Sequence, residues 1–269
     1  MKKIIAIAVI SAAGVCLQSV HASLLFSDNF DSYSTGDLTS SDVNPGTSTG
    51  WSGGNSGIVV INGGLTYSGL YSSASGNMLA ITNGSAGSAY TTYANQTSGT
   101  IFYSFLFQPN VVDSANNYFT ALNPTTTSPS GGSDAIDAYY YSSGKIELRA
   151  AAQSATAGTG TALTIGTTYL IVEELNLTAD TASLWIDPSS SSFGGSAPTA
   201  TATLSGTTAT AIDNIGFKAQ SGTGNYDIDD ILIGTTWADV TTVASPEPSV
   251  LALAGAGLGL LGLMRFRRS

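Results

Sequence analysis

Cysteine and histidine are nearly absent from this chain, which has one of each in 269 residues. Both stand near the start, as Cys16 and His21, so residues 23–244 contain neither. Without a thiol or an imidazole, this middle part cannot form a disulfide, a Cys or His zinc site, a Ser-His-Asp triad or a Cys-His dyad. A metal bound there would need oxygen ligands, which favours calcium. An enzyme built there would have to rely on carboxylates, tyrosine or the few bases.

Positive charge is also scarce in the middle of the chain. Residues 23–244 contain three basic residues, Lys145, Arg149 and Lys218, against 17 acidic ones, a net charge of −14. A body of this charge repels a phosphate backbone, so we expect no nucleic-acid partner. It would attract cations, although solubility alone explains acids that are spread along the chain.

The first 22 residues predict a signal peptide. Lys2 and Lys3 form a basic start, residues 4–17 are apolar, and a small-x-small pattern predicts cleavage after Ala22. Cys16 leaves a lipoprotein leader open as an alternative. Either reading predicts export of the body.

The last 25 residues combine three features in a fixed order. A proline bracket comes first, then an uncharged run at 249–264, then a basic end: Pro246, Glu247 and Pro248, followed after the run by Arg265, Arg267 and Arg268. Sixteen helical residues span about 24 Å, slightly less than the ~30 Å hydrocarbon core, and snorkelling arginines can cover the difference. Because basic clusters stay on the cytoplasmic side, the body would lie outside.

Together the two ends resemble the PEP-CTERM class of exported bacterial proteins. The resemblance covers residues 245–269 and implies a sorting segment with a single transmembrane helix, processed by an exosortase-type membrane enzyme. The protein would then be membrane-anchored in the cell envelope before processing and on the cell surface or outside the cell afterwards. A plain C-terminal anchor remains an alternative.

Between the ends, short β-branched and aromatic runs recur between Gly, Ser and Asn clusters, and no stretch sustains helical apolar spacing. Asn62-Gly63-Gly64 and Ser142-Ser143-Gly144 suggest hairpin turns. The run at 99–109 is apolar on both faces and predicts a central strand. About a dozen strands favour an all-β, two-layer antiparallel sandwich, with predicted strands at 24–30, 58–61, 65–67, 77–82, 99–109, 118–122, 135–141, 145–150, 168–177, 181–187, 211–219 and 227–233.

Several of these runs resemble the strands of concanavalin A-like (LamG-like) jelly-roll domains. The matching stretches are LLFSDNFDSYSTGDL near the start, and TYLIVEELNLTADTASLWIDP, IDNIGFKA and YDIDDILIGTTWADV near the end. The resemblance implies one jelly-roll domain over residues 23–244. Lectins, laminin G domains and glycosidases share this fold, so the fold alone leaves the function open.

Carboxylates in the first and last strands suggest a metal site. Because these strands often pair in jelly rolls, the resemblance suggests that Asp28 or Asp31 joins Asp229 in a structural calcium site, completed by loop carbonyls. The alternative is that these carboxylates accept hydrogen bonds from backbone amides.

A run of aromatic residues suggests a sugar platform. Tyr139 and Tyr141 share a strand face, and Trp51 is a further candidate for carbohydrate binding, although packing alone enriches tyrosine in strands. Glu173 and Glu174 are adjacent in a strand and point to opposite faces, so they cannot form an acid–base pair. We expect one of them to face solvent and the other to pair with Arg149 or Lys218.

These observations predict a non-enzymatic exported protein of the cell surface or extracellular matrix, associated with exopolysaccharide or other envelope material. A dedicated carbohydrate-binding module is one alternative. A polysaccharide-degrading hydrolase or lyase is another, although the Glu-x-Asp-x-(x)-Glu strand of glycosidases with this fold is missing.

Overall fold

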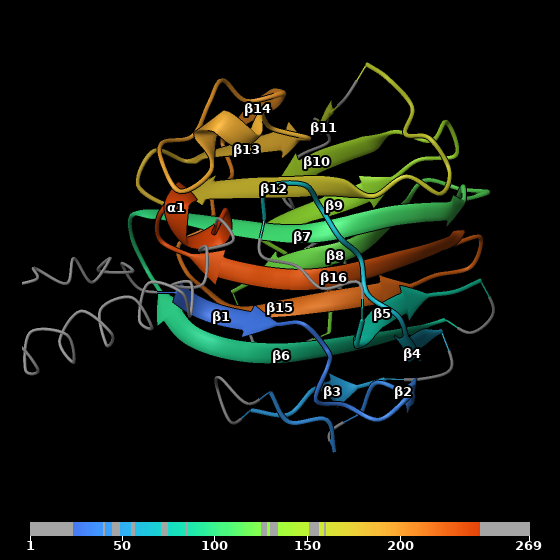
Figure 1. The fold of residues 1–269 in the computed structure, drawn as a ribbon. Helices are drawn as coiled ribbons and strands as arrows, with labels where there is room; N and C mark the ends of the chain where they lie inside the picture. The colour runs from blue at the N-terminus through green and yellow to red at the C-terminus, as the bar shows by residue number, and fades with distance from the viewer. Residues whose placement is uncertain are drawn as a thin grey trace, which may run out of the picture.

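The computed structural model describes residues 24–242, apart from 40, 45–48, 55–56, 71–74, 84–85, 125–127, 130–133, 151–155 and 159. The described residues form two antiparallel sheets packed face to face (Figure 1). The prediction of an all-β two-layer antiparallel sandwich is therefore confirmed.

The front sheet in Figure 1 has nine strands among the described residues. Eight follow the order β14 (Ala202–Ser205), β13 (Thr181–Ile186), β12 (Tyr169–Asn176), β7 (Thr100–Val111), β16 (Asn225–Gly234), β5 (Asn77–Ile81), β4 (Ile58–Asn62) and β2 (Gly36–Asp37). The ninth, β1 (Leu24–Asp28), also pairs with β16, so the first and last strands are neighbours as predicted.

The second sheet has seven strands among the described residues and lies behind the first. Its order is β11 (Thr156–Gly158), β10 (Ile146–Ala150), β9 (Ile136–Tyr140), β8 (Asn117–Asn123), β15 (Ile212–Ala219), β6 (Gly87–Gln96) and β3 (Ser52–Gly53). A 3₁₀ turn, η1 (Ser190–Ser192), and one short helix, α1 (Trp237–Val240), are the helical elements of the described chain.

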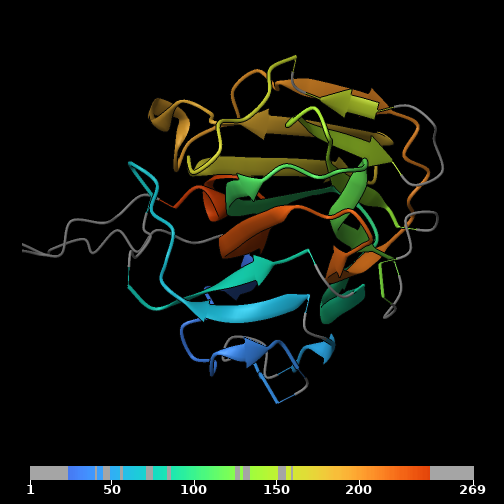
Figure 2. The same cartoon turned by 90° about the vertical axis from the view of Figure 1, so that its right-hand side faces the viewer.

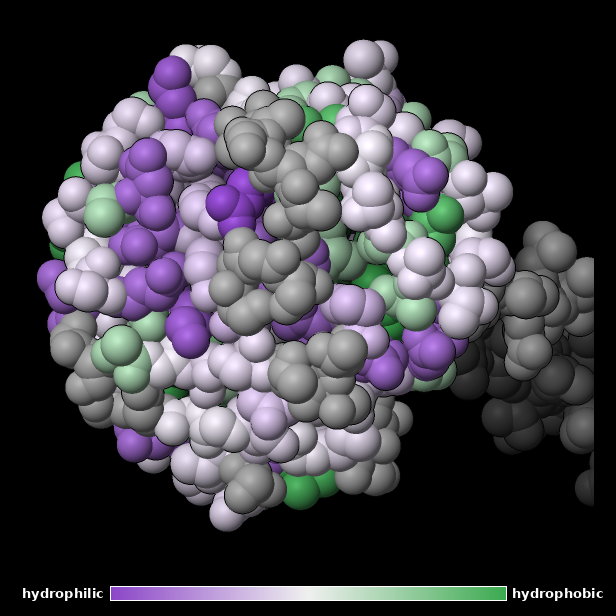
Figure 3. Space-filling model, turned by 180° about the vertical axis from the view of Figure 1, so that it is seen from behind, coloured by the Kyte–Doolittle hydropathy of each residue, from purple (hydrophilic) through white to green (hydrophobic). Residues whose placement is uncertain are grey.

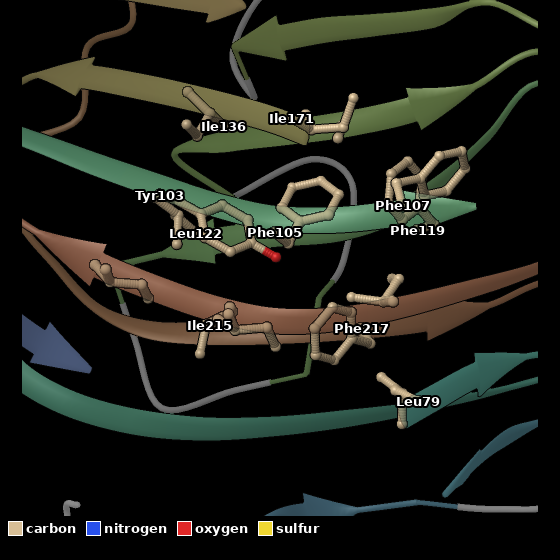
Figure 4. Close-up of a cluster of buried hydrophobic side chains, with 14 of the residues drawn as sticks. Leu79, Tyr103, Phe105, Phe107, Phe119, Leu122, Ile136, Ile171, Ile215 and Phe217 are labelled. Atoms are coloured by element: carbon tan, nitrogen blue, oxygen red, sulfur yellow. The ribbon is translucent and has the colours of Figure 1, made fainter. Parts of the chain in front are cut away.

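The main core lies between the sheets, where the pleat of each strand turns every second side chain inward. The inward residues of β7 are all buried and meet apolar residues of the second sheet (Figure 4): Tyr103, Phe105 and Phe107 face Phe119, Leu122, Ile136, Ile215 and Phe217. Phe105 and Phe119 pack edge to face with ring centroids 5.9 Å apart. β7 lies between β12 and β16 and is buried on both faces, which confirms its predicted central position.

A second apolar cluster covers the outer face of the nine-stranded sheet. Three connections, at 63–70, 187–200 and 235–242, fold over that face (Figure 2) and supply many of its members. The buried residues of the cluster are Leu65, Phe102, Leu106, Leu170, Val172, Trp185, Phe193, Trp237 and Val240. We call this surface the closed face, because these side chains fill it.

The structure corrects several predicted strands. Residues 65–67 form no strand, since the chain leaves β4 at the glycine turn and crosses the sheet so that Leu65 packs into the closed face. The turn at 62–64 therefore closes no tight hairpin, and β4 pairs with β5 across residues 63–76. The longest missed strand is β6, whose sequence GSAYTTYANQ alternates small and polar residues and has few apolar ones. Four short strands, β2, β3, β11 and β14, were not predicted either.

The predictions for the two ends lie outside the described residues. They are the cleavage site after Ala22, the Pro246-Glu247-Pro248 motif, the apolar run and the terminal arginines. Within the described parts of residues 24–242, no helix combines the length and apolarity needed to cross a bilayer.

Candidate functional site

The outer face of the seven-stranded sheet carries polar and aromatic side chains where the other sheet carries its second apolar cluster. In β9, Ile136 and Ala138 belong to the main core, so Asp137 and Tyr139 point outward. We call this surface the polar face and define it by its outward residues Tyr90, Tyr118, Asn123, Asp137, Tyr139, Arg149, Asn214, Gly216 and Lys218. Figure 3 views the molecule from this side, where purple hydrophilic residues lie among pale and green ones.

The few basic residues of the body gather at this sheet. Arg149 lies in β10 and Lys218 in β15, and both point to the polar face, because Leu148 and Phe217 beside them belong to the main core. Lys145 directly precedes β10. Two of the three basic residues of the body thus lie on the polar face.

Arg149 and Asp137 contact each other on neighbouring strands of the polar face. Arg149 stands opposite Asp137 in the β9–β10 ladder and donates from Nη2 to Oδ2 at 3.5 Å. Burial, followed by a hydrogen bond and charge from Asp134, raises the pKa of Asp137, while Arg149 lowers it. The guanidinium also lies over the ring of Tyr139, 4.6 Å from its centroid. Arg149 is therefore fixed by a carboxyl group and an aromatic ring together.

Three tyrosines form a row beside this pair. The ring centroids of Tyr118 and Tyr139 are 5.7 Å apart, and those of Tyr139 and Tyr141 are 5.9 Å apart. The predicted proximity of Tyr139 and Tyr141 is confirmed. Tyr118 and Tyr139 are 9% and 8% exposed, so they offer edges to a ligand, and half-buried Tyr141 offers the most surface.

The proposed role of Trp51 in sugar binding is wrong. Trp51 is fully buried between the sheets, where its ring lies 5.5 Å from that of Phe217. Its indole nitrogen donates to Asp28 at 3.0 Å. A side chain without exposed surface cannot stack on a saccharide, and the sequence around Trp51 gave no strand pattern that revealed its direction.

Two asparagines at one end of the polar face have unsatisfied amide groups. Asn123 and Asn214 are paired across β8 and β15 and are 1% and 0% exposed. Neither amide atom of Asn214 has a hydrogen-bond partner, and the same holds for Nδ2 of Asn123 and Oδ1 of Asp137. A buried polar group without a partner costs about 1–3 kcal/mol. These groups therefore have unused hydrogen-bonding capacity, although they are covered in this structure. Sequence analysis missed both asparagines, although asparagine within a strand is unusual enough to mark them.

The predicted calcium site does not form. Asp28 points into the main core, where it accepts hydrogen bonds from Tyr33, Trp51 and the backbone of Phe30. Asp229 points to the closed face and accepts from the backbone nitrogen of Leu65 at 2.9 Å. The sheet itself thus separates the two carboxylates.

Burial raises the pKa of Asp229 to about 8, and the charges of Asp230 and Asp31 add to this rise. The carboxylate of Asp31 accepts from the backbone of Asn77 at 2.9 Å. No group of three or more acidic, His or Cys side chains suited to a metal occurs in the described part of the chain. The alternative prediction, carboxylates bonded to backbone amides, is the one that the structure confirms.

The two adjacent glutamates also differ from expectation. Glu173 lies in the main core, 1% exposed, and neither carboxyl oxygen has a hydrogen-bond partner. It therefore pairs with neither Arg149 nor Lys218, and burial raises its pKa to about 8. Glu174 points to the other side of β12, as predicted, and is half-buried.

Comparison with known proteins gives distant likenesses. No known family model matches the chain, and no curated protein matches it in sequence. Among solved structures, lectin II from Ulex europaeus is 13% identical with a TM-score of 0.41, covering 79% of this chain and 99% of the lectin. A Trypanosoma rangeli sialidase mutant with trans-sialidase activity is 12% identical with a TM-score of 0.41, covering 67% of this chain. The alginate lyase from Corynebacterium sp. is 8% identical with the same score.

The coverage of these proteins is uneven. This chain spans only 27% of the sialidase and 75% of the alginate lyase. Likenesses this distant carry no information about a ligand or a reaction. The candidate site therefore depends on the side chains of the polar face.

Proposed function

We propose that the chain is an exported, non-enzymatic protein of the cell surface or extracellular matrix, whose jelly-roll body binds saccharide through the polar face. Its leader and its PEP-CTERM-like tail support export and processing by an exosortase-type enzyme. Exopolysaccharide or another envelope glycan is the expected partner. The observation that carries the binding function is the set of buried, unpartnered polar atoms on Asn123, Asn214 and Asp137, beside a row of tyrosines.

The chemistry of these groups fits a sugar. Amide and carboxyl groups can donate to and accept from neighbouring hydroxyls, and tyrosine rings offer apolar surface with a polar tip. Arg149 adds further N–H donors in a fixed orientation, held by Asp137 and Tyr139. Because the body is strongly acidic, a neutral saccharide fits it better than a polyanion.

Binding is tested with the full chain, purified in a mild detergent and applied to a panel of neutral and acidic glycans. We expect binding to a neutral glycan and a loss of about tenfold or more in Arg149→Ala, the size of effect given by losing hydrogen bonds from a charged donor. Thr203→Ala, an exposed change on strand β14 of the other sheet, is the matched control. Absence of binding to every glycan would contradict the proposal.

A second candidate is a polysaccharide hydrolase or lyase. The hydrogen-bonded pair Asp134 and Asp137 supports it, because the raised pKa of Asp137 keeps a proton available near neutral pH. Release of reducing or unsaturated sugar ends from the bound glycan, abolished in Asp137→Asn, would establish this activity. Unchanged glycan after long incubation would favour simple binding.

Export is tested separately, by sequencing the protein recovered from the producing cells. We expect a mature N-terminus at Ser23 and material at the cell surface or in the medium. An intact leader on protein in the cell interior would contradict this part of the proposal.

A further inference from the structure

A short piece of the chain lies directly on the polar face. Residues Ser128 and Pro129 follow β8, and Pro129 is buried against Gly216 of β15. A methyl group added to Gly216 would clash with Cγ of the proline ring and lie 2.6 Å from its Cδ. It would also lie 3.2 Å from Cβ of Tyr90. Only glycine leaves space for a ring here, between Tyr90 and Tyr118.

Within the described part of the chain, two side-chain hydrogen bonds join this piece to the strands. The hydroxyl of Tyr118 donates to the carbonyl oxygen of Pro129 at 3.3 Å, and the hydroxyl of Ser128 bonds that of Ser88 at 2.6 Å. No backbone–backbone hydrogen bond links Ser128 or Pro129 to the strands within the described part of the chain. Each of these two side-chain bonds contributes about 1 kcal/mol.

The surroundings of the proline ring are more polar than the ring itself. Gly216 pairs with Ala121, and Ala121 pairs with Asp137, so these residues form one row across three strands. Asn214 lies on the same face, two residues from Gly216. Oδ1 of Asp137 and both amide atoms of Asn214 have no hydrogen-bond partner while Pro129 occupies this position. A proline ring supplies apolar contact and cannot donate or accept through its carbons.

We propose that the space over Gly216 that the Pro129 ring fills, between Tyr90 and Tyr118, is the ring-binding subsite for a neutral pyranose, and that Pro129 occupies it until a saccharide displaces it. This inference rests on the proposed saccharide-binding function. A pyranose presents C–H groups to the glycine floor and hydroxyls to Asp137 and Asn214, so it satisfies groups that proline leaves unpaired. Pro129 thus acts as an internal competitor.

Ser88 and Ser128 allow a direct test, because their hydroxyl oxygens are already within bonding distance. A Ser88→Cys/Ser128→Cys variant in a Cys16→Ser background contains no other thiol, and a disulfide of ~2.05 Å fits the space between the two side chains. Oxidation would hold Pro129 in its place over Gly216, and reduction would release it. We expect glycan affinity to be about tenfold or more weaker in the oxidised than in the reduced form of the same full-length protein.

The opposite change removes one attachment. Ser128→Ala should bind the glycan about fivefold more tightly, the factor that corresponds to one hydrogen bond of about 1 kcal/mol. Each single cysteine variant, treated with the same oxidant, is the matched control. Equal affinity of the oxidised and reduced double variant, with glycan still bound, would overturn the internal competitor and leave the proposed function intact. Failure of the wild type, the reduced variant and Ser128→Ala to bind any glycan would overturn the proposed function itself.

Discussion

The two outer faces of the sandwich differ in whether their buried polar atoms have hydrogen-bond partners. On the closed face, the indole nitrogen of Trp185 donates to Pro198 at 2.9 Å, and that of Trp237 donates to Ser192 at 3.0 Å. The hydroxyl of Ser104 donates to Val240 at 2.7 Å. On the polar face, Asn214 and Asp137 are equally buried and keep atoms without partners.

This difference separates stability from binding. A buried face with satisfied hydrogen bonds and tightly packed aromatics adds to the free energy of unfolding. A buried face with unpaired donors and acceptors lowers that free energy and recovers the loss only when a ligand supplies partners. We therefore expect mutations on the two faces to differ in size and even in sign.

The largest expected effect is on the closed face. Trp237 is 3% exposed, and its ring packs 5.1 Å from Trp185 and 6.1 Å from Phe102. Trp237→Ala should lower the free energy of unfolding by about 3–5 kcal/mol, measured by chemical denaturation. Tyr141→Ala, at the edge of the tyrosine row, should cost about 1 kcal/mol, because one neighbouring ring is its main aromatic contact. Equal losses at the two positions would remove the distinction between the faces.

The next effect comes from the layer between the faces. Glu173 is ionised in the unfolded chain above its ordinary pKa of 4.5, whereas in the folded protein burial raises that pKa to about 8. Between these values the folded state binds the extra proton, so the free energy of unfolding falls as pH rises. The contribution of Glu173 to the free energy of unfolding is therefore fully present below pH 4.5 and is lost as the pH approaches 8.

Glu173→Gln removes this titration and keeps the side-chain volume. Denaturation between pH 5 and 8 should show a slope smaller by on the order of 1 kcal/mol per pH unit than in the wild type. Half-buried Glu174, changed to glutamine in the same strand, is the matched control and should leave most of the slope unchanged. An unaltered slope in Glu173→Gln would show that the carboxyl group meets a partner or solvent in solution.

Strands could be predicted from the sequence where their buried residues form an apolar pattern, and were missed where they do not. The central strand β7 was predictable because both of its faces are apolar, TIFYSFLF, and hydrophobic periodicity reports burial directly. Strand β6 was missed because GSAYTTYANQ relies on Ala89 and Tyr93 for its buried face and otherwise resembles a loop.

The candidate site could also be predicted only in part. Alternation placed Tyr139 and Tyr141 together, since residues two apart in a strand share a face. Alternation did not reveal that Trp51 and Asp28 lie between the sheets, or that Asp229 lies on the closed face. Those positions depend on contacts between residues that are distant in sequence. Asn123 and Asn214 are 91 positions apart and meet only through the β8–β15 register.

The sharpest way to distinguish the two outer faces is a pair of mutations that change the free energy of unfolding in opposite directions. Asn214→Leu replaces an unpartnered amide by an apolar side chain of similar volume and should raise the free energy of unfolding by about 1 kcal/mol while weakening glycan binding. Ser104→Ala on the closed face removes a satisfied bond and leaves the carbonyl of Val240 unpaired, so it should lower the free energy of unfolding by about 1 kcal/mol. Destabilisation by Asn214→Leu would mean that ordered water already satisfies that amide.

The smallest effect on stability should come from the contact between Arg149 and Asp137, although loss of Arg149 should have a large effect on binding. The Arg149 side chain is 23% exposed, and its partner Asp137 is fully buried with a raised pKa. Because burial and Asp134 raise the pKa of Asp137 to about 9, its carboxyl group already holds a proton at pH 7. When Arg149→Gln removes the cation, that pKa rises further, so no unpaired buried charge is left behind. We therefore expect a change in the free energy of unfolding below about 1 kcal/mol at pH 7. A double-mutant cycle with Asp137→Asn measures the coupling. A coupling well above about 2 kcal/mol would show that this pair stabilises the fold, and the polar face could then no longer be regarded as a surface reserved for ligand.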